Sequence, residues 1–369
     1  MKIALLGDIA IFGRYCITKN KSVFRYLDKV REHLSKFDIV IGNLEAPFAT
    51  NENPIIGKSA TVKSHPANIE LLNYIRLTHV NLANNHIGDF GIKGYKRTKE
   101  LLISNGIDWF GTEDKQIDLE ICNEKISLLG FCSYNTNPSP VRFKSKNNLN
   151  YLDANLVYRK LKNNFDRGFF NIIAIHSGQE HIHLPSSEDV KFARKIANNF
   201  DYVYYGHHPH VIQAFEKVNG SAIFYSLGNF IFDDVFTPRD HKEPLIKRSE
   251  ANKTGLIGEI EIQKGKLVNN HSTPIYMSEE SMIVDNEIDD IDLDVYNSFV
   301  KNAGTLEYDR DRSNSIKKFI EQRREMRNLK WYVNRLNFNS VGILLKARKN
   351  LRLYQKHFLS KVDLIEEKK

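Results

Sequence analysis

Five apolar runs in this chain end in residue types that bind metals, and this repetition constrains the fold more than any other feature of the sequence. The runs begin at Lys2, Asp38, Thr78, Phe170 and Asp201. The polar residues that end them are Asp8, Asn43, Glu45, Asn84, Asn85, His86, His176, His207, His208 and His210. Continuous β-branched runs are typical of strands covered on both faces, and ligands gather beyond the carboxyl ends of such strands. The pattern therefore predicts an α/β protein in which one shared rim collects all five polar ends.

Each of these side chains has an ordinary structural explanation when it is taken alone. Asp8 could satisfy the free backbone donors of a turn or helix start. Glu45 could be a solvated loop acid, and Asn84-Asn85 is by itself a turn signal. His176 could be a hydrogen-bonded histidine at a strand end, and His208-Pro209-His210 could be an exposed loop. Because coincidence at all five strand ends is far rarer than any one of these explanations, the set favours a metal site.

The residue types at these strand ends indicate which metals would bind. Carboxylate, amide oxygen and neutral imidazole together suit Mn, Fe, Zn or Co, whereas an all-oxygen set would suggest Mg or Ca and a thiolate set structural zinc. Two such ions about 3.5–4 Å apart could clamp a phosphate and activate water for in-line attack. The ligand chemistry therefore predicts metal-assisted phosphoester hydrolysis with one or two ions, with Mn, Fe and Zn as the main candidates.

Six short motifs, in order along the chain, resemble the successive signatures of the CapA family. That family is named for poly-gamma-glutamate capsule synthesis and is similar to the calcineurin-like metallophosphoesterases. The resemblance covers roughly residues 1–275. The motifs are Gly7-Asp8, Gly42-Asn43-Leu44-Glu45, Ala83-Asn84-Asn85-His86-Ile87-Gly88-Asp89-Phe90-Gly91, His176-Ser177-Gly178-Gln179-Glu180-His181, Gly206-His207-His208-Pro209-His210-Val211 and Tyr225-Ser226-Leu227-Gly228-Asn229-Phe230-Ile231-Phe232-Asp233.

Carried over position by position, the resemblance implies a set of metal ligands. It places Asp8 and His210 on one ion, with Glu45 bridging. The second ion would be held by Asn85, His176 and His208. The chain departs from many metallophosphoesterases at Ala10, where they have the histidine of an Asp-x-His motif. A one-metal enzyme therefore stays an alternative to a two-metal one.

The same resemblance gives roles to residues beside the ligands. His86 would protonate the leaving oxygen or support the transition state, a role that general acid catalysis gives an imidazole. Asp89 would orient the His86 ring. The substrate pocket is expected to be lined by residues at four further motif positions, which are Glu180, Asn229, Asn43 and His207. His181 and His183 are interpreted as surface histidines.

The composition limits the classes of protein to which this chain can belong. A chain of 369 residues with 41% hydrophobic content can bury a large core. Three cysteines without a CxxC spacing indicate neither a disulfide framework nor a thiolate zinc site. The first run starts at Lys2, which leaves no room for a signal peptide, and no apolar run approaches the ~20 residues of a transmembrane helix. We therefore expect a cytoplasmic protein.

Between the five runs, the chain alternates as a layered α/β protein should. Helical apolar spacing occurs in residues 24–37, 67–76, 92–105, 154–164 and 187–199. After residue 211 short strands predominate, with hairpin turns at Asn219-Gly220 and Lys264-Gly265. The pattern permits, and the resemblance implies, a four-layer αββα sandwich of metallophosphoesterase type with a C-terminal helical appendage. The loop over residues 236–253 could be a flap over the site or an ordinary surface loop.

Charge divides the chain unevenly. Residues 310–369 contain 17 Lys and Arg against 6 Asp and Glu, so the tail accounts for the net charge of +8. We predict a catalytic domain over residues 1–275, an acidic linker over 276–308 and a basic helical extension over 309–369, with amphipathic helices at 316–336 and 341–358. Docking on the catalytic domain or on a second subunit, contact with an anionic membrane, and binding of nucleic acid or another polyanion stay open for the tail, with nucleic acid the least favoured.

Three functions from different classes follow from these observations. The preferred one is a metal-dependent phosphatase or phosphodiesterase in bacterial capsule or surface-polymer synthesis, acting on a phosphorylated glycan or polymer precursor, with a tail that could bring it to the inner face of the membrane. The second is a non-catalytic accessory subunit of a polymer synthase. The third is a nuclease-like phosphodiesterase, which only the basic tail suggests.

Overall fold

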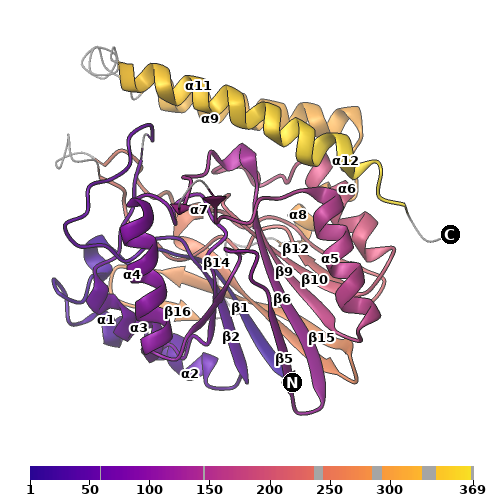
Figure 1. The fold of residues 1–369 in the computed structure, drawn as a ribbon, viewed down its shortest axis with the longest axis horizontal. Coiled ribbons are helices and arrows are strands. Elements are labelled where there is room, and N and C mark those ends of the chain that lie inside the picture. Colours follow the sequence, from indigo (N-terminus) through magenta and orange to yellow (C-terminus); the bar gives the residue numbers. More distant parts are fainter. Residues whose placement is uncertain (59, 144–145, 237–243, 285–292, 326–337, 367–369) are drawn as a thin grey trace.

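The computed structural model describes residues 1–58, 60–143, 146–236, 244–284, 293–325 and 338–366. Two β-sheets lie at the centre of the molecule and helices cover their outer faces (Figure 1). Among the described residues no helix is both long and apolar enough to cross a membrane. The expectation of a cytoplasmic location stays a prediction.

The first sheet combines a parallel half and an antiparallel half. β1 (Lys2–Ile9), β2 (Ile39–Leu44), β3 (His79–Asn81) and β4 (Asp108–Phe110) are parallel neighbours. β14 (Thr254–Gln263), β15 (Lys266–Met277) and β16 (Met282–Val284) continue the sheet on the other side of β1 in antiparallel order. The short strand β13 (Asn229–Ile231) pairs with β1 beyond the end of β14.

The second sheet has six strands in the order β11-β12-β10-β9-β6-β5. The three parallel strands at its centre are β6 (Glu124–Cys132), β9 (Phe170–His176) and β10 (Tyr202–His207). β12 (Ser221–Phe224) is parallel to β10, whereas β11 (Phe215–Val218) and β5 (Ile117–Ile121) are antiparallel edges. A separate two-stranded sheet joins β7 (Arg142–Phe143) and β8 (Lys146–Asn147).

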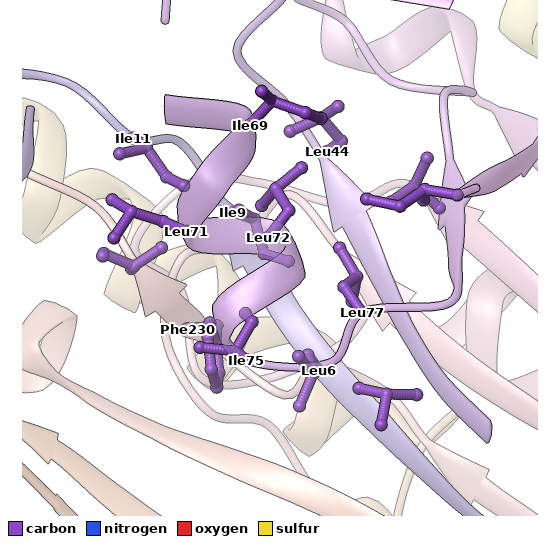
Figure 2. Close-up of a cluster of buried hydrophobic side chains, with 14 of the residues drawn as sticks. Leu6, Ile9, Ile11, Leu44, Ile69, Leu71, Leu72, Ile75, Leu77 and Phe230 are labelled. Carbon is purple, nitrogen blue, oxygen red and sulfur yellow. The ribbon is translucent and has the colours of Figure 1, made fainter. Parts of the chain in front are cut away.

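Three apolar clusters separate the layers and confirm the predicted αββα sandwich. One cluster lies between the sheets and includes Leu5 of β1, Leu128 of β6 and Val203 of β10. A second lies between the first sheet and α1 (Val23–Tyr26), α2 (Asp28–Leu34), α3 (Ile69–Tyr74) and α4 (Gly91–Ser104). Figure 2 shows how side chains of α3 and of Ile75, which follows it, meet those of the strands, with Ile69, Leu72 and Ile75 lying near Leu6, Ile9 and Leu44.

The third cluster lies on the outer face of the second sheet. It joins α5 (Ala154–Asp166) and α6 (Ser187–Ala197) to the strands. Both helices begin at side-chain caps, because Asp153 accepts a hydrogen bond from Leu156 N and Ser186 accepts one from Asp189 N. The shorter elements are η1 (Gly13–Tyr15), η2 (Pro66–Asn68), η3 (Tyr134–Thr136) and α7 (Glu250–Lys253).

The C-terminal helices share the same core. α8 (Leu293–Val300), α11 (Phe338–Tyr354), the π-helical turn η4 (Gln355–Leu359) and α12 (Ser360–Val362) contribute buried side chains to the third cluster. α9 (Leu306–Glu325) and α11 run along one end of the molecule, beyond the sheets (Figure 1). The helix predicted at 316–336 thus begins ten residues earlier, and its part at 326–336 lies outside the described residues, as do 237–243 of the predicted flap.

Two expectations about organisation need comment. The five polar strand ends lie at one rim as expected, but that rim is formed by two sheets rather than one, because β1, β2 and β3 belong to the first sheet and β9 and β10 to the second. Apolar runs report burial on both faces and cannot show which sheet a strand joins. The domain division at 275 stays a prediction, although β15 and β16 extend the first sheet to Val284.

Candidate metal centre

The carboxyl ends of strands from both sheets meet at one buried site. In the first sheet Asp8 of β1 is in register with Asn43 of β2 and with Asn229 of β13. In the second sheet His176 of β9 is in register with His207 of β10. The segment after β12 approaches β10 so closely that position 206 must be glycine, because a Cβ there would lie 1.9 Å from Tyr225 O. Six predicted ligands from five strand ends are therefore brought together.

The turn after β10 presents two histidines in an unusual backbone conformation. The φ angle is 96° at His208 and 57° at His210, whereas most residues with side chains avoid positive φ. Such strain costs on the order of 1–3 kcal/mol per residue and is concentrated at functional sites. Packing of the two sheets holds this turn in place, because Asp8 Oδ2 accepts a hydrogen bond from His208 N at 3.1 Å.

Asp8 is a fully buried carboxylate surrounded by nitrogen atoms. Asn43 Nδ2 donates to Asp8 Oδ1 at 2.7 Å, and His210 Nδ1 lies 3.3 Å from Asp8 Oδ2. Burial raises the pKa of Asp8, but contact with His207 and the charges of His210 and His176 outweigh it, so the pKa lies below its usual range. Asp8 is therefore held as an anion, the form that a metal requires.

Glu45 is the least satisfied group of the site. Its side chain is fully buried, and neither carboxylate oxygen has a hydrogen-bond partner among the described residues. Three imidazoles face Oε1, with Nε2 of His176 at 3.7 Å, Nε2 of His210 at 3.8 Å and Nε2 of His86 at 3.9 Å. Burial raises the pKa of Glu45 to about 8, because it outweighs the positive charges of His210 and Lys58, which lower the pKa. An unpaired carboxylate in this position is unfavourable unless a cation accompanies it.

The remaining predicted ligands surround the same space. His176 Nε2 lies 3.0 Å from Asn85 Oδ1, and the His176 and His208 rings are 4.9 Å apart. Ligand atoms of Glu45, His208 and His210 all lie within 4.8 Å of one another. His208 Nδ1 has no hydrogen-bond partner in the described part of the chain. This set of carboxylate, amide and imidazole donors, with buried atoms left unpaired, fits one or two divalent transition metals.

His86 lies at the edge of this cluster in a fixed orientation. Its Nδ1 is 2.6 Å from Asp89 Oδ2, and Lys58 Nζ donates to Asp89 Oδ1 at 2.8 Å and to Asn85 O at 2.6 Å. Ser139 and Val62 N also donate to Asp89. Asp89 and Lys58, whose Nζ lies 2.9 Å from His86 Nδ1, hold the Nδ1 side of the ring, and His86 Nε2 is left facing Glu45.

A pocket opens beside the cluster and gives it an entrance. His86 and His210 line it, and so do apolar side chains of Val62, Phe232 and Ile246, which belong to one apolar cluster. The polar lining consists of Glu180, His181, Asn229, Asp233, Arg248 and Asn252. Asn229 Oδ1 accepts a hydrogen bond from His210 Nδ1 at 2.9 Å, and Asn229 Nδ2 donates to Asn252 O at 2.9 Å. Glu180 and Asn229 thus lie where the sequence places them, at the pocket.

Two other predicted substrate residues lie elsewhere. Asn43 and His207 are both buried, and neither is among the described residues that line the pocket. Asn43 accepts hydrogen bonds from Asn81 and Asn84 and donates to Asp8. His207 Nδ1 lies 3.2 Å from Asp8 Oδ1. Both positions suit residues that orient Asp8 rather than residues that touch a substrate.

Sequence reasoning missed three residues at this site. His181 was interpreted as a surface histidine but is half-buried in the pocket beside His210, with ring centroids 6.4 Å apart. Its place directly after Glu180 was the only signal available. Lys58 and Arg248 come from loops without any motif, and only the fold brings them to His86 and to the pocket.

Fold and site together define a four-layer α/β protein with a buried carboxylate and imidazole centre at the ends of its strands. The chain belongs to the family described as bacterial capsule synthesis protein PGA_cap, whose model matches residues 2–234. The resemblance to the CapA family is thereby confirmed.

Two proteins named CapA are also similar to this chain. The PGA biosynthesis protein CapA of Bacillus subtilis is 26% identical over 333 residues, covering 86% of this chain and 84% of that protein. The capsule biosynthesis protein CapA of Bacillus anthracis is 26% identical over 255 residues, covering 64% and 61%. Among solved structures, a putative 5'-nucleotidase from Staphylococcus aureus gives a TM-score of 0.48 at 11% identity, covering 82% of this chain and 58% of that one.

Proposed function

We propose that this protein is a metal-dependent phosphoester hydrolase that acts in bacterial capsule or surface-polymer biosynthesis. The observation that carries the proposal is the Glu45 carboxylate, which is fully buried, has no hydrogen-bond donor among the described residues and faces three imidazoles. A buried carboxylate without hydrogen bonds destabilises a protein unless a bound cation compensates its charge. The link to capsule synthesis is supported by the family and by the names of the two CapA relatives.

Residues of the chain would have distinct roles in the hydrolysis. Asp8, Glu45, Asn85, His176, His208 and His210 would hold the metal. When bound, divalent ions polarise a phosphoryl oxygen and make water more acidic. His86 Nε2 faces the centre while Asp89 holds the opposite side of the ring, so a protonated His86 can give its Nε2 proton to a leaving oxygen. The apolar wall of the pocket excludes water from that transfer.

An accessory role in polymer synthesis is the second candidate function, and one observation favours it. Ala10 is fully buried in an apolar cluster with Ala46, Phe232 and Val235. This is the position where many metallophosphoesterases have a ligand histidine, so the first ion would have fewer ligands here. A Mycobacterium tuberculosis relative, 23% identical over 212 residues, is named a probable polyglutamine synthesis accessory protein.

The first experiment is elemental analysis of protein purified without chelator, followed by assays with an aryl phosphate and an aryl phosphodiester in added Mn. We expect bound metal in the wild type, loss of metal in His208→Ala, and retained metal with at least about 100-fold slower turnover in His86→Gln. His271→Ala is the matched control, because His271 is an exposed histidine on β15. Absence of metal from the wild type would overturn the site. Metal without turnover of either ester would favour the accessory role.

A further inference from the structure

The helix α11 docks on the protein along one side only. Asn350 and Tyr354, one turn apart, are buried, and Asn350 Nδ2 donates to Asn137 Oδ1 at 2.9 Å. Tyr354 packs in the third apolar cluster with Phe358 of η4. α11 lies along the outside of the molecule (Figure 1). The opposite side of the helix is its outer face, which comprises the exposed residues Val341, Leu344, Leu345, Arg348, Lys349, Leu351 and Arg352.

The outer face of α11 exposes four large apolar side chains. Residues that are three, four or seven positions apart lie on the same side of a helix, so these side chains are neighbours along α11. A single exposed leucine needs no explanation, but a group of them on one helix face marks an interaction surface. The four are Val341 (53% exposed), Leu344 (65%), Leu345 (60%) and Leu351 (54%).

The charged residues of the outer face all have the same sign. Arg348, Lys349 and Arg352 lie between and beside the leucines, and no ion pair joins them to an acidic residue in the described part of the chain. The sequence has no Asp or Glu anywhere between positions 326 and 362. α9, at the same end of the molecule, differs, because it contains Glu307, Asp309, Asp311, Glu321 and Glu325. The outer face of α11 therefore combines leucines with positive charge that no acid of the helix offsets.

This combination of side chains discriminates between the partners that could cover α11. A second copy of the chain would place the same cations against each other, which is unfavourable. A nucleic acid would pair with the cations through its phosphates but would leave the leucines in water. An anionic bilayer suits both, because leucines enter the boundary of the acyl chains and cations meet the headgroups. Long lysine and arginine side chains reach the headgroups from positions between the leucines.

We propose that the outer face of α11 docks on an anionic lipid surface, with its leucines at the acyl-chain boundary and its cations at the headgroups. This inference concerns a surface outside the metal centre and does not depend on the hydrolysis of any ester. Docking would hold the centre near the lipid, because α11 contacts Asn137 beside η3, and Thr136 O of η3 accepts a hydrogen bond from Asn85 Nδ2 at 3.4 Å.

The test is sedimentation of the full-length protein with vesicles of phosphatidylcholine mixed with anionic phosphatidylglycerol, and with vesicles of phosphatidylcholine alone. We expect binding to the anionic vesicles that weakens in high salt, and little binding to the neutral ones. The double variant Leu344→Gln and Leu351→Gln should bind at least about tenfold more weakly, because two side chains are no longer buried in lipid. Arg348→Gln with Lys349→Gln should weaken binding by about fivefold for each charge.

Matched control substitutions lie on helices that cover the first sheet. Ile103 of α4 is 66% exposed, and Lys29 of α2 is an exposed cation. The double variant Ile103→Gln and Lys29→Gln should bind vesicles within about twofold of the wild type, because these residues are remote from the proposed contact. Glutamine is a good helix former and all substituted residues are exposed, so circular dichroism should show every variant folded.

Three results would overturn the inference. The first is absence of vesicle binding, or equal binding to neutral vesicles. The second is binding that depends on the cations but not on the leucines, with duplex DNA bound as tightly as vesicles, which would make nucleic acid the partner. The third is a dimer in light scattering that the leucine substitutions convert to a monomer, which would assign the outer face to a second copy of the chain.

Discussion

Two buried glutamates show that burial alone does not make a functional residue. Glu124 is 8% exposed, and its two oxygens accept hydrogen bonds from Lys264 N and Gly265 N at 2.6 and 2.8 Å. It fixes the hairpin turn between β14 and β15. Glu45 is 0% exposed and accepts no hydrogen bond from a described residue. The hydrogen bonds of Glu124 stabilise the fold. The unpaired carboxylate of Glu45 destabilises it, and a bound cation would remove this destabilisation.

This contrast predicts opposite effects of the same substitution. Glu124→Gln should destabilise the protein by about 1–3 kcal/mol, because one backbone N–H loses its acceptor. Glu45→Gln should leave the metal-free protein at least as stable as the wild type, because it removes a carboxylate that is costly to bury. Thermal unfolding in chelator and in added Mn would measure both. A clear loss of stability for metal-free Glu45→Gln would contradict the idea that this carboxylate exists for a cation.

At the scale of elements, the site depends on how closely β13 approaches β1. Asp8 N donates to Gly228 O at 3.0 Å, and Asn229 of β13 holds the His210 ring. This approach requires glycine at position 7, because a Cβ there would lie 2.2 Å from Gly228 O. Glycine is thus required at position 7, and the close packing that it allows sets the positions of two predicted site residues, Asp8 and Asn229.

Gly7→Ala should therefore separate β13 from β1, and we expect a loss of about 3 kcal/mol together with weaker metal retention. The matched control is Gly342→Ala, because nothing lies near that position in the middle of α11. Alanine is the better helix former, so the control should gain up to about 1 kcal/mol. Chemical denaturation and elemental analysis of both variants are the measurements. Full metal retention in a stable Gly7→Ala protein would disprove the role of this contact.

For the whole molecule, the basic C-terminal region is part of the core rather than an attachment to it. Phe358 of η4 is fully buried and meets Phe192 of α6 at a centroid distance of 5.3 Å. Val362 and Ile365 lie in the same cluster. Of the roles that the sequence left open for the tail, these contacts support docking on the catalytic domain.

Truncating Phe358 should therefore be as damaging as truncating a central core residue. We expect Phe358→Ala to cost about 3–5 kcal/mol in one cooperative unfolding transition. Leu345→Ala, at a residue that is 60% exposed on α11, should change stability by less than about 0.5 kcal/mol. Urea unfolding followed by far-UV circular dichroism distinguishes the two. A separate early transition in the wild type would instead support an independent C-terminal unit.

The docking of this region should also weaken in acid. Asp153 caps α5 and binds Lys361 and, at 2.8 Å, His357. Burial raises the pKa of Asp153, but these hydrogen bonds outweigh it and lower the pKa below its usual value. Such a carboxylate stabilises the fold above the unfolded-state pKa of about 4, and the contribution is lost as the pH falls through the lower folded-state pKa.

Asp153→Asn, which removes the charge but keeps an oxygen for the cap, should therefore be destabilising at pH 7 and less destabilising at pH 3. Unfolding midpoints at the two pH values are the measurement. Glu120→Gln is the control, since Glu120 is exposed and pairs with Lys125 at the surface. An unchanged difference between wild type and Asp153→Asn at the two pH values would show that these ion pairs do not hold the C-terminal helices.

The sequence by itself determined which residue types end the strands, the alternation of strands and helices, the order of the motifs and the family. These features are local, because apolar runs, helix caps and turn residues act within a few positions. Six predicted ligands, from Asp8 to His210, could be named for this reason, and the structure places them around one buried space.

Only the tertiary structure decided which sheet each strand joins, and therefore which side chains face the site. Strands buried on both faces look alike in sequence, so nothing local separates β1 to β3 from β9 and β10. The positions of Asn43 and His207 behind Asp8 follow from that packing. Lys58 carries no motif, and it reaches His86 and Asp89 only because segments far apart in the chain pack against the same rim.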